Sequence, residues 1–342
     1  MTTREKHAAL CMLAAAMFIA GWQQQATAAD TFTVVLLPDT QYYTEQSYGG
    51  TMEMFHAQTQ YIVNNAAAKN IVYVTHVGDI TNNGASAIQW QRATEAMYRL
   101  DALPGLRWGT VTGNHDVTGD GVSRYVAAFG APHFAGRSWA GFGGANDASS
   151  YQIFTAGGRT YLGLCLQYGA DTSAADLNWA RQVLDSHPGM PVILTTHDYL
   201  SGGGTSASRS APGQRLWDNF IRFYDQIFLV LSGHNPSPGM GRRVDNNNFG
   251  HPVFQMYACY QFWSQGGYGL MRELTFDESR GLIHVETFSP WNGTVLTDDG
   301  NRFDLYLNFN ERLGPAAVVP EPLAASMVVA AAMMCCLRRR RT

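Results

Sequence analysis

Polar side chains follow five apolar, strand-like segments of the sequence, at the point where each segment ends. They are oxygen donors and imidazoles, which suit Mn, Fe or Zn, whereas a soft site would use thiolates. The candidates are Asp39 and Gln41 after 32–38, Asp79 after 71–77, Asn114, His115 and Asp116 after 106–112, His197 at the end of 191–197, and His234 after 227–233. Ligands of α/β sheets bind in the crevice beyond the carboxyl ends of the strands. The spacing therefore predicts one metal site built from all five segments.

The elements that must position these groups alternate between strand and helix patterns. Helical patterns at 52–70, 85–103, 174–187 and 212–224 separate the five strand segments, which predicts an α/β fold. From about residue 253 the pattern changes to strands joined by turns, and 150–167 is typical of a hairpin that turns at Gly157 and Gly158. We therefore expect mixed sheets, with crossovers first and a meander after. Two glycine-rich stretches, 136–144 and 201–213, are expected to be surface loops.

Composition limits the class of function. The chain has 342 residues, of which 46% are hydrophobic, so it can bury a large core. Its formal net charge is -4, but residues 30–319 keep 17 of the 23 basic and 25 of the 27 acidic residues, a net charge of -8. An acidic domain of this kind argues against nucleic-acid binding, because that needs clustered positive charge.

The order of the polar motifs resembles the calcineurin-like metallophosphoesterase family, whose signature runs D-x-H, G-D, G-N-H-[DE], H and G-H-x-H. The resemblance implies a four-layer α-β-β-α sandwich of mixed sheets. It also implies hydrolysis of a phosphomonoester or phosphodiester by a metal-activated water. In the family's arrangement Asp79 would bridge two metals, Asp39 would bind the first, and the second would be completed by Asn114, His197 and His234. His115 would face the substrate as a catalytic group, oriented by Asp116.

Two departures from this signature affect the first metal. Gln41 stands where the family has the histidine of D-x-H, and Pro236 stands where it has the last histidine of G-H-x-H. The D-T-Q motif resembles that of a secreted bacterial subgroup. A glutamine amide oxygen can ligate a hard metal, although more weakly than an imidazole. Either Gln41 with two carboxylates and waters holds a first metal, or the site is mononuclear; Asn235 and His251 are weaker candidates for a replacement ligand.

A different class of function also fits these departures. An exported binding or scaffold protein of the cell surface or matrix could keep a degenerate metallophosphatase site. Arg242 and Arg243 are expected in a loop near the site, where a guanidinium could pair with phosphate or simply end a solvated loop. Cys165 and Cys259 lie in apolar, strand-like runs and are expected to be buried thiols.

The two ends of the chain are typical of targeting segments. Residues 1–29 contain a charged start, an apolar run and small residues, which predicts a secretory signal peptide. Residues 320–342 contain Pro-Glu-Pro, an apolar run of 15 residues and four arginines. This end resembles the PEP-CTERM sorting tail of Gram-negative bacteria, which implies cutting by an exosortase-type protease and transient membrane association. We therefore expect the domain at 30–319 to work in the periplasm, at the cell surface or in the extracellular matrix.

Overall fold

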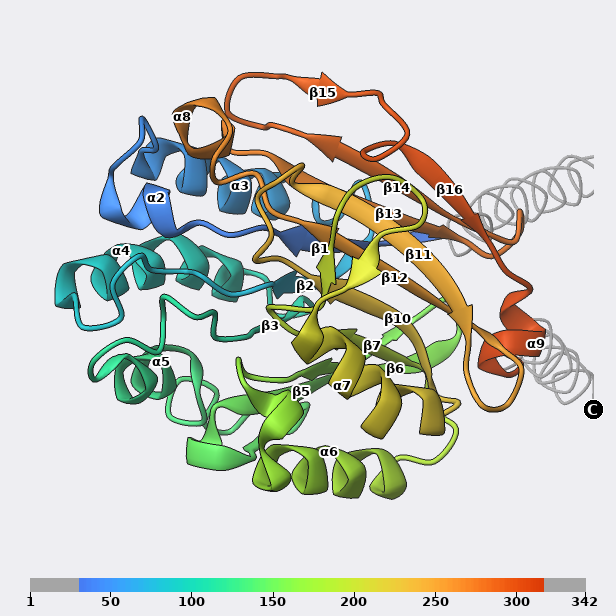
Figure 1. Ribbon diagram of the computed structural model, residues 1–342. Coiled ribbons are helices and arrows are strands. Elements are labelled where there is room, and N and C mark those ends of the chain that lie inside the picture. The colour runs from blue at the N-terminus through green and yellow to red at the C-terminus, as the bar shows by residue number, and fades with distance from the viewer. Residues whose placement is uncertain (1–30, 317–342) are drawn as a thin grey trace, which may run out of the picture.

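Two seven-stranded sheets lie face to face in the computed structural model, which describes residues 31–316 (Figure 1). The expected signal peptide and sorting tail lie outside the described residues. The first sheet contains β1 (Thr31–Leu37), β2 (Ile71–His76), β3 (Arg107–Thr110), β13 (Met271–Asp277), β14 (Leu282–Phe288), β15 (Val295–Leu296) and β16 (Phe303–Tyr306). The second contains β4 (Ala140–Gly143), β5 (Ser149–Ala156), β6 (Arg159–Cys165), β7 (Val192–Thr195), β10 (Ile227–Ser232), β11 (Met240–Asn246) and β12 (Pro252–Ala258).

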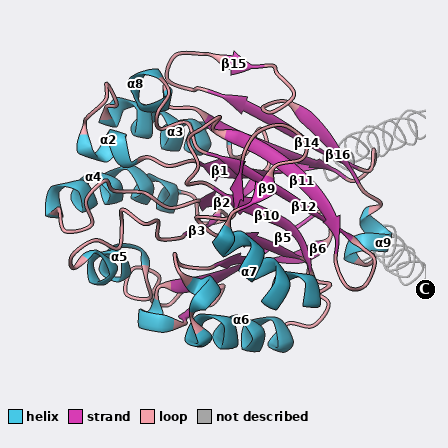
Figure 2. Ribbon diagram, viewed as in Figure 1, coloured by secondary structure: helices cyan, strands magenta, loops and turns pink. Residues whose placement is uncertain are grey.

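Helices cover the outer face of each sheet (Figure 2). The first sheet carries α2 (Gln41–Glu45), α3 (Met52–Asn65), α4 (Ala87–Met97) and α5 (Gly121–Phe129). The second carries α6 (Ala174–Ser186) and α7 (Ala211–Asn219), and the short helices α8 (Ser264–Gly267) and α9 (Phe309–Leu313) lie in later connections. This arrangement confirms the predicted four-layer α-β-β-α sandwich of mixed sheets.

Three apolar layers hold the sandwich together. The central layer lies between the sheets and includes Phe32, Tyr161 and Phe228, which are fully buried. The outer layers join each sheet to its helices, for example through Phe55 on α3 and Trp217 on α7. Since the central strands are covered on both faces, they are apolar along almost their whole length, which explains the continuous apolar runs in the sequence.

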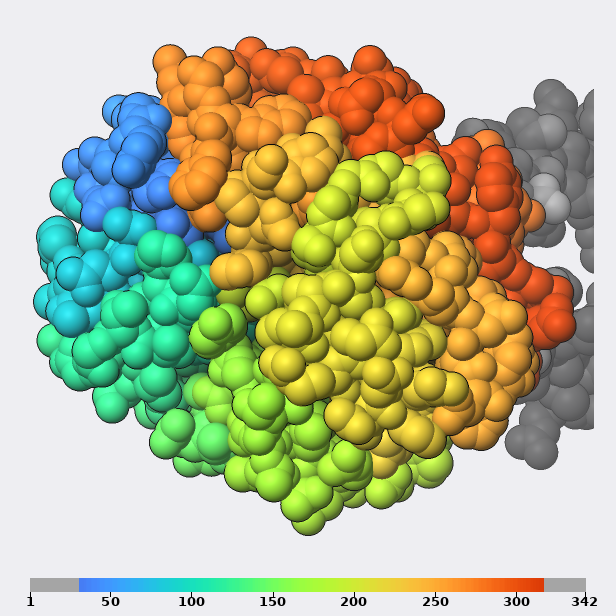
Figure 3. Space-filling model, in the orientation of Figure 1, coloured from blue at the N-terminus to red at the C-terminus, as the bar shows by residue number. Residues whose placement is uncertain are grey.

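The direction of the strands brings the polar motifs to one edge. Strands β1, β2 and β3 are parallel in the first sheet, and β6, β7, β10 and β12 are parallel in the second. In the space-filling view, the N-terminal segments in blue and teal lie against later segments in yellow and orange (Figure 3). The crevice beyond the carboxyl ends of the strands is therefore lined by residues from both halves of the chain.

The predicted strands and helices are present, but two glycine-rich stretches are more ordered than expected. Strand β4 lies within 136–144 and pairs with β5. The stretch 201–213 contains most of a small hairpin of β8 (Leu200–Ser201) and β9 (Ser208–Arg209) and the start of α7. A Cβ atom at Gly141 would lie 2.3 Å from the ring of Tyr151 on the paired strand. Gly141 is thus required by close packing within a sheet. In the sequence alone, such a glycine-rich stretch resembles a loop.

Two further findings concern the chemistry of the chain. Cys165 and Cys259 are buried and free, which confirms the prediction of two buried thiols.

Among the helices at 31–316, none combines the length and the apolar character needed to cross a bilayer.

Candidate metal centre

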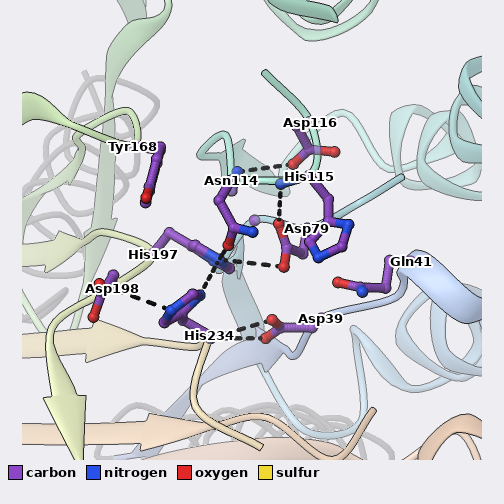
Figure 4. Close-up of polar contacts among 12 residues, drawn as sticks. Asp39, Gln41, Asp79, Asn114, His115, Asp116, Tyr168, His197, Asp198 and His234 are labelled. Atoms are coloured by element: carbon purple, nitrogen blue, oxygen red, sulfur yellow. Dashed lines mark hydrogen bonds and ion pairs between the residues drawn. The ribbon is translucent and has the colours of Figure 1, made fainter. Parts of the chain in front are cut away.

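The five loops that follow β1, β2, β3, β7 and β10 meet at the carboxyl edge of the two sheets (Figure 4). The structure brings all of the sequence-predicted site residues to this place: Asp39, Gln41, Asp79, Asn114, His115, Asp116, His197 and His234. We call the group Asp79, Asn114, His197 and His234 the second metal position, and the group Asp39, Gln41 and Asp79 the first metal position.

The second metal position is a tight group of donors. Nε2 of His197 lies 3.0 Å from Oδ1 of Asn114 and 3.3 Å from Oδ2 of Asp79. Nδ1 of His234 lies 3.1 Å from the same Nε2, and donor atoms of Asp79, His197 and His234 all lie within 4.8 Å of one another. Nδ1 of His197 lies 2.9 Å from the carbonyl oxygen of Val77, to which it donates. A backbone carbonyl in this role fixes the ring of a metal-binding histidine and points its other nitrogen at the metal.

The charges of this group suit a cation. Burial alone would lower the pKa of His197, but the carboxylate of Asp79 raises it to about 10. Burial would raise the pKa of Asp79, but the facing His197 lowers it below its ordinary value. Burial and the charge of His197 lower the pKa of His234. Without a metal, the proton on His197 therefore separates donor atoms of His197, His234 and Asp79 whose lone pairs would otherwise repel one another. A metal ion would replace that proton.

The first metal position is built from oxygen atoms. Asp39 is buried and accepts the backbone N–H of His234 at 3.2 Å. Burial raises the pKa of Asp39 to about 7, with the charge of His197 opposing this shift and that of Asp79 adding to it. Nε2 of Gln41 donates to Oδ1 of Asn82 at 3.1 Å, whereas its buried Oε1 has no hydrogen-bond partner in residues 31–316. An unsatisfied buried carbonyl costs about 1–3 kcal/mol, and a bound cation would remove that cost. The residues present therefore fit a metal at both positions.

The structure corrects the expected contact between Asp116 and His115. Nδ1 of His115 lies 2.9 Å from the carbonyl oxygen of Asn82, so the backbone of the loop after β2 orients the ring. The buried carboxylate of Asp116 instead accepts hydrogen bonds from the backbone N–H groups of Ile80, Thr81 and Gly113 and from the Thr81 hydroxyl. Asp116 thus ties the loop after β3 to the loop after β2. Burial and the charge of Asp79 raise the pKa of Asp116 to about 6.

Close packing explains why glycine precedes two of the site residues, Asn114 and His234. A Cβ atom at Gly113 would lie 2.1 Å from Oδ1 of Asp79, and one at Gly233 would lie 2.4 Å from Oδ1 of Asp39. Asp79 and His234 themselves have positive φ angles of 47° and 69°. Such conformations cost about 1–3 kcal/mol each away from glycine and cluster at functional sites. The strain falls on the residues whose side chains converge.

The sequence analysis assigned no role to three residues that lie in the site. Asn82 contacts both Gln41 and His115, and its backbone N–H donates to Oε1 of Gln89 at 2.8 Å. Tyr168 follows β6, and the centre of its ring lies 6.0 Å from the centre of the His197 ring. Asp198 lies 3.8 Å from Nε2 of His234. Their position just after a strand, or beside a predicted ligand, was the available signal in the sequence.

Other candidates lie elsewhere. Arg242 and Arg243 belong to β11 and not to a loop, because this segment pairs with β12 along seven residues. The Arg242 guanidinium lies 3.9 Å from the centre of the Phe303 ring, and Arg243 forms an ion pair with Asp245. His251 precedes β12, at the end of the sheet opposite the site, and lies 2.8 Å from a carboxylate oxygen of Asp225. These contacts use the arginines and His251 structurally.

Comparison with known proteins adds to this geometry. The family described as "Calcineurin-like phosphoesterase" matches residues 32–238. The "Uncharacterized protein YvnB" of Bacillus subtilis (strain 168) is 35% identical over 270 residues, which are 77% of this chain and 20% of that protein. The chain therefore spans about one fifth of the length of this curated relative.

Two solved structures are similar to this chain at low sequence identity. The purple acid phosphatase PPD1 from yellow lupin (Lupinus luteus) seeds superposes with a TM-score of 0.52 at 13% identity, over 84% of this chain and 56% of that chain. A dimetal phosphatase from Danio rerio gives a TM-score of 0.46 at 14% identity, over 78% of this chain and 98% of that chain. At 13% identity, the lupin enzyme supports the fold alone.

Proposed function

Because the chain belongs to the calcineurin-like phosphoesterase family, we propose that it is a metal-dependent hydrolase of phosphoester bonds. The observation that carries this proposal is the convergence of donor atoms from Asp79, His197 and His234 within 4.8 Å of one another. Two imidazoles, a carboxylate and the amide oxygen of Asn114 together form a donor set suited to Mn, Fe or Zn. Asp39 and Gln41 extend this set toward a first metal.

The site residues divide the chemistry between them. When bound, the metal ions would neutralise the phosphate charge and lower the pKa of a water molecule. The substrate would be a phosphomonoester or a phosphodiester. His115 donates through Nδ1 to the carbonyl of Asn82, so its Nε2 is the nitrogen free to face the substrate. In that position the ring would stabilise charge on the phosphoryl oxygens and pass a proton to the leaving oxygen.

One assay tests this function. The full chain is stripped of metal, reloaded with Mn, Fe or Zn, and assayed on p-nitrophenyl phosphate and its bis ester. We expect metal-dependent turnover that Asp79→Ala and His115→Ala each reduce by at least about 100-fold. His284→Ala is the matched control, because His284 lies on β14 and pairs with Asp304. Metal binding without turnover above the Asp79→Ala and His115→Ala variants would instead support the binding or scaffold protein and exclude the enzyme.

We also propose that the domain works outside the cytoplasm of a Gram-negative bacterium. Support comes from the sequences of residues 1–29 and 320–342 alone. The tail would be recognised by an exosortase-type protease while it is briefly in the membrane. Deleting Arg338 to Arg341 in the native host should leave an uncut precursor, detectable by its mass, and unchanged processing would contradict the sorting role.

A further inference from the structure

The two metal positions differ in the chemistry of their donors. The second position combines two imidazole nitrogens with the oxygens of Asp79 and Asn114. In the first position, Gln41 and Pro236 replace the two residues that would bring imidazole, and a proline side chain has no donor atom. What remains is the carboxylate of Asp39, the shared carboxylate of Asp79 and the Gln41 amide.

The orientation of the Gln41 amide is fixed by its neighbours. Its Nε2 donates to Oδ1 of Asn82, so Oε1 points the other way, and Figure 4 shows the amide end reaching from α2 toward Asp79. Asn82 is itself held, because Oε1 of Gln89 accepts its backbone N–H at 2.8 Å. Gln41 is fully buried, and its Oε1 has no partner within residues 31–316. A buried acceptor that the surrounding chain holds in place and leaves unpaired is poised for a ligand.

His76 does not supply the missing imidazole. It is buried, and its Nδ1 accepts the backbone N–H of Gly78 at 3.2 Å. Its Nε2 lies 2.9 Å from the hydroxyl of Thr40. Both ring nitrogens are therefore occupied. Within residues 31–316, the buried thiol of Cys259 lies beside Asp39 and is a soft donor that needs an experimental control.

We propose that the first metal position is an all-oxygen site that selects a hard divalent cation, Mn²⁺ or Mg²⁺, while the second position takes Zn²⁺. Carboxylate, carbonyl and water ligands suit Mg²⁺ and Mn²⁺, whereas imidazole favours Zn²⁺. The centre would then hold two different ions. This inference rests on the proposed metal-dependent function, and Gln41 becomes the residue that decides which ion enters the first position.

Metal content tests the inference without an activity assay. The metal-free full chain is equilibrated with buffered Zn²⁺ and a large excess of Mn²⁺, because a given site ordinarily binds Zn²⁺ more tightly. Unbound metal is then removed, and bound metal is measured by mass spectrometry, with the Mn²⁺ EPR signal as a second readout. Wild type should hold one Zn²⁺ and one Mn²⁺ per chain. Gln41→His should exchange the Mn²⁺ for a second Zn²⁺, and Gln41→Leu should weaken Mn²⁺ binding by about 10–100-fold while keeping Zn²⁺.

Matched controls separate this result from general disruption. Gln91→His adds an imidazole to the exposed face of α4 and should leave the metal content unchanged. Cys259→Ser should also leave it unchanged. Retained Zn²⁺ shows that Gln41→Leu is folded, and if that variant loses both metals, Gln41→His alone decides the question.

Several results would overturn the proposal. Wild type could bind two Zn²⁺ ions, or two of which one is lost in Cys259→Ser. Gln41→Leu could bind Mn²⁺ as tightly as wild type does, or Gln41→His could select the same metals as wild type. A chain that holds both ions but hydrolyses no ester would refute the proposed function and leave this inference standing. Turnover by a chain holding two Zn²⁺ would refute this inference alone.

Discussion

Nδ1 of His234 lies 3.1 Å from Nε2 of His197, so two imidazoles direct their ring nitrogens into the same small space. Asp79 closes that space from a third side, with Oδ2 at 3.3 Å from Nε2 of His197. Only a proton or a cation can occupy such a position between nitrogen and carboxylate donors. The site is thus arranged around a positive charge, which the His197 proton supplies in the metal-free protein and a metal ion would supply in its place.

Metal affinity at the second position should rise with pH. Although burial lowers it, the pKa of His197 is raised to about 10 by Asp79, so the ring carries a proton at neutral pH that a metal must displace. Release of one proton predicts roughly a tenfold gain in Zn²⁺ affinity per pH unit between about pH 7 and 9. Competition with a chelator at several pH values measures this slope, and an affinity independent of pH would contradict the assignment.

Acid should destabilise the metal-free protein through His76. Burial and the charge of His197 lower the pKa of His76 to about 3, below its ordinary value of 6.5. Unfolding therefore takes up a proton, and stability that is complete above about pH 6.5 is lost as the pH falls toward 3. Between pH 7.5 and 5 the loss should be about 2 kcal/mol. Urea unfolding of wild type and His76→Gln at both pH values checks this, and parallel losses in the two proteins would disprove it.

Replacing Asn82 should weaken the positioning of both Gln41 and His115. Its side chain accepts a hydrogen bond from the Gln41 amide, so Asn82→Ala frees that amide. The backbone carbonyl that accepts from His115 stays in the variant, but the loop that carries it loses its anchor to Gln41. We expect kcat/KM to fall by about 10–100-fold, with weaker binding of the first metal. The adjacent Asn83→Ala removes a local hydrogen bond to Ala85 and should leave both properties near wild type. Equal effects of the two variants would show that the loop, and not Asn82, is responsible.

A methyl group at position 113 should displace a metal ligand. The Cβ atom of Gly113→Ala would lie 2.1 Å from Oδ1 of Asp79, so the carboxylate or the loop must move. Overpacking of this kind costs about 1–3 kcal/mol of unfolding free energy. The variant should also bind less metal when measured by mass spectrometry. At Gly105, where nothing lies within 4 Å of the added atom, alanine should change neither property; full metal content in Gly113→Ala would contradict the packing argument.

The sequence predicted the fold and the set of converging residues because each depends on local patterns. Continuous apolar runs mark doubly covered strands, and polar residues such as Asp79 and His197 stand directly after them. The contacts between loops could not be predicted in the same way. Asp116 was expected beside the His115 ring, yet its carboxylate satisfies backbone N–H groups of a neighbouring loop, a choice that depends on how the two loops pack.

Strands at sheet edges were also difficult to predict. Strand β11 shows no clear alternation, and its Arg242 and Arg243 suggested a polar loop near the site. This segment becomes a strand because it pairs with β12, and nothing in its own sequence indicates that pairing. Asn82 was missed for a related reason, since an asparagine in a loop is ordinarily a turn residue. Its importance comes from contacts to Gln41 and His115, which are distant in sequence.

The most direct test is an anomalous difference map from a crystal of the full chain grown with Zn²⁺. We predict a peak about 2.0–2.3 Å from Nε2 of His197, Nδ1 of His234 and the side-chain oxygens of Asp79 and Asn114. A map with no peak among these four residues, or with Zn²⁺ bound by other side chains, would contradict the account of this site as a metal centre.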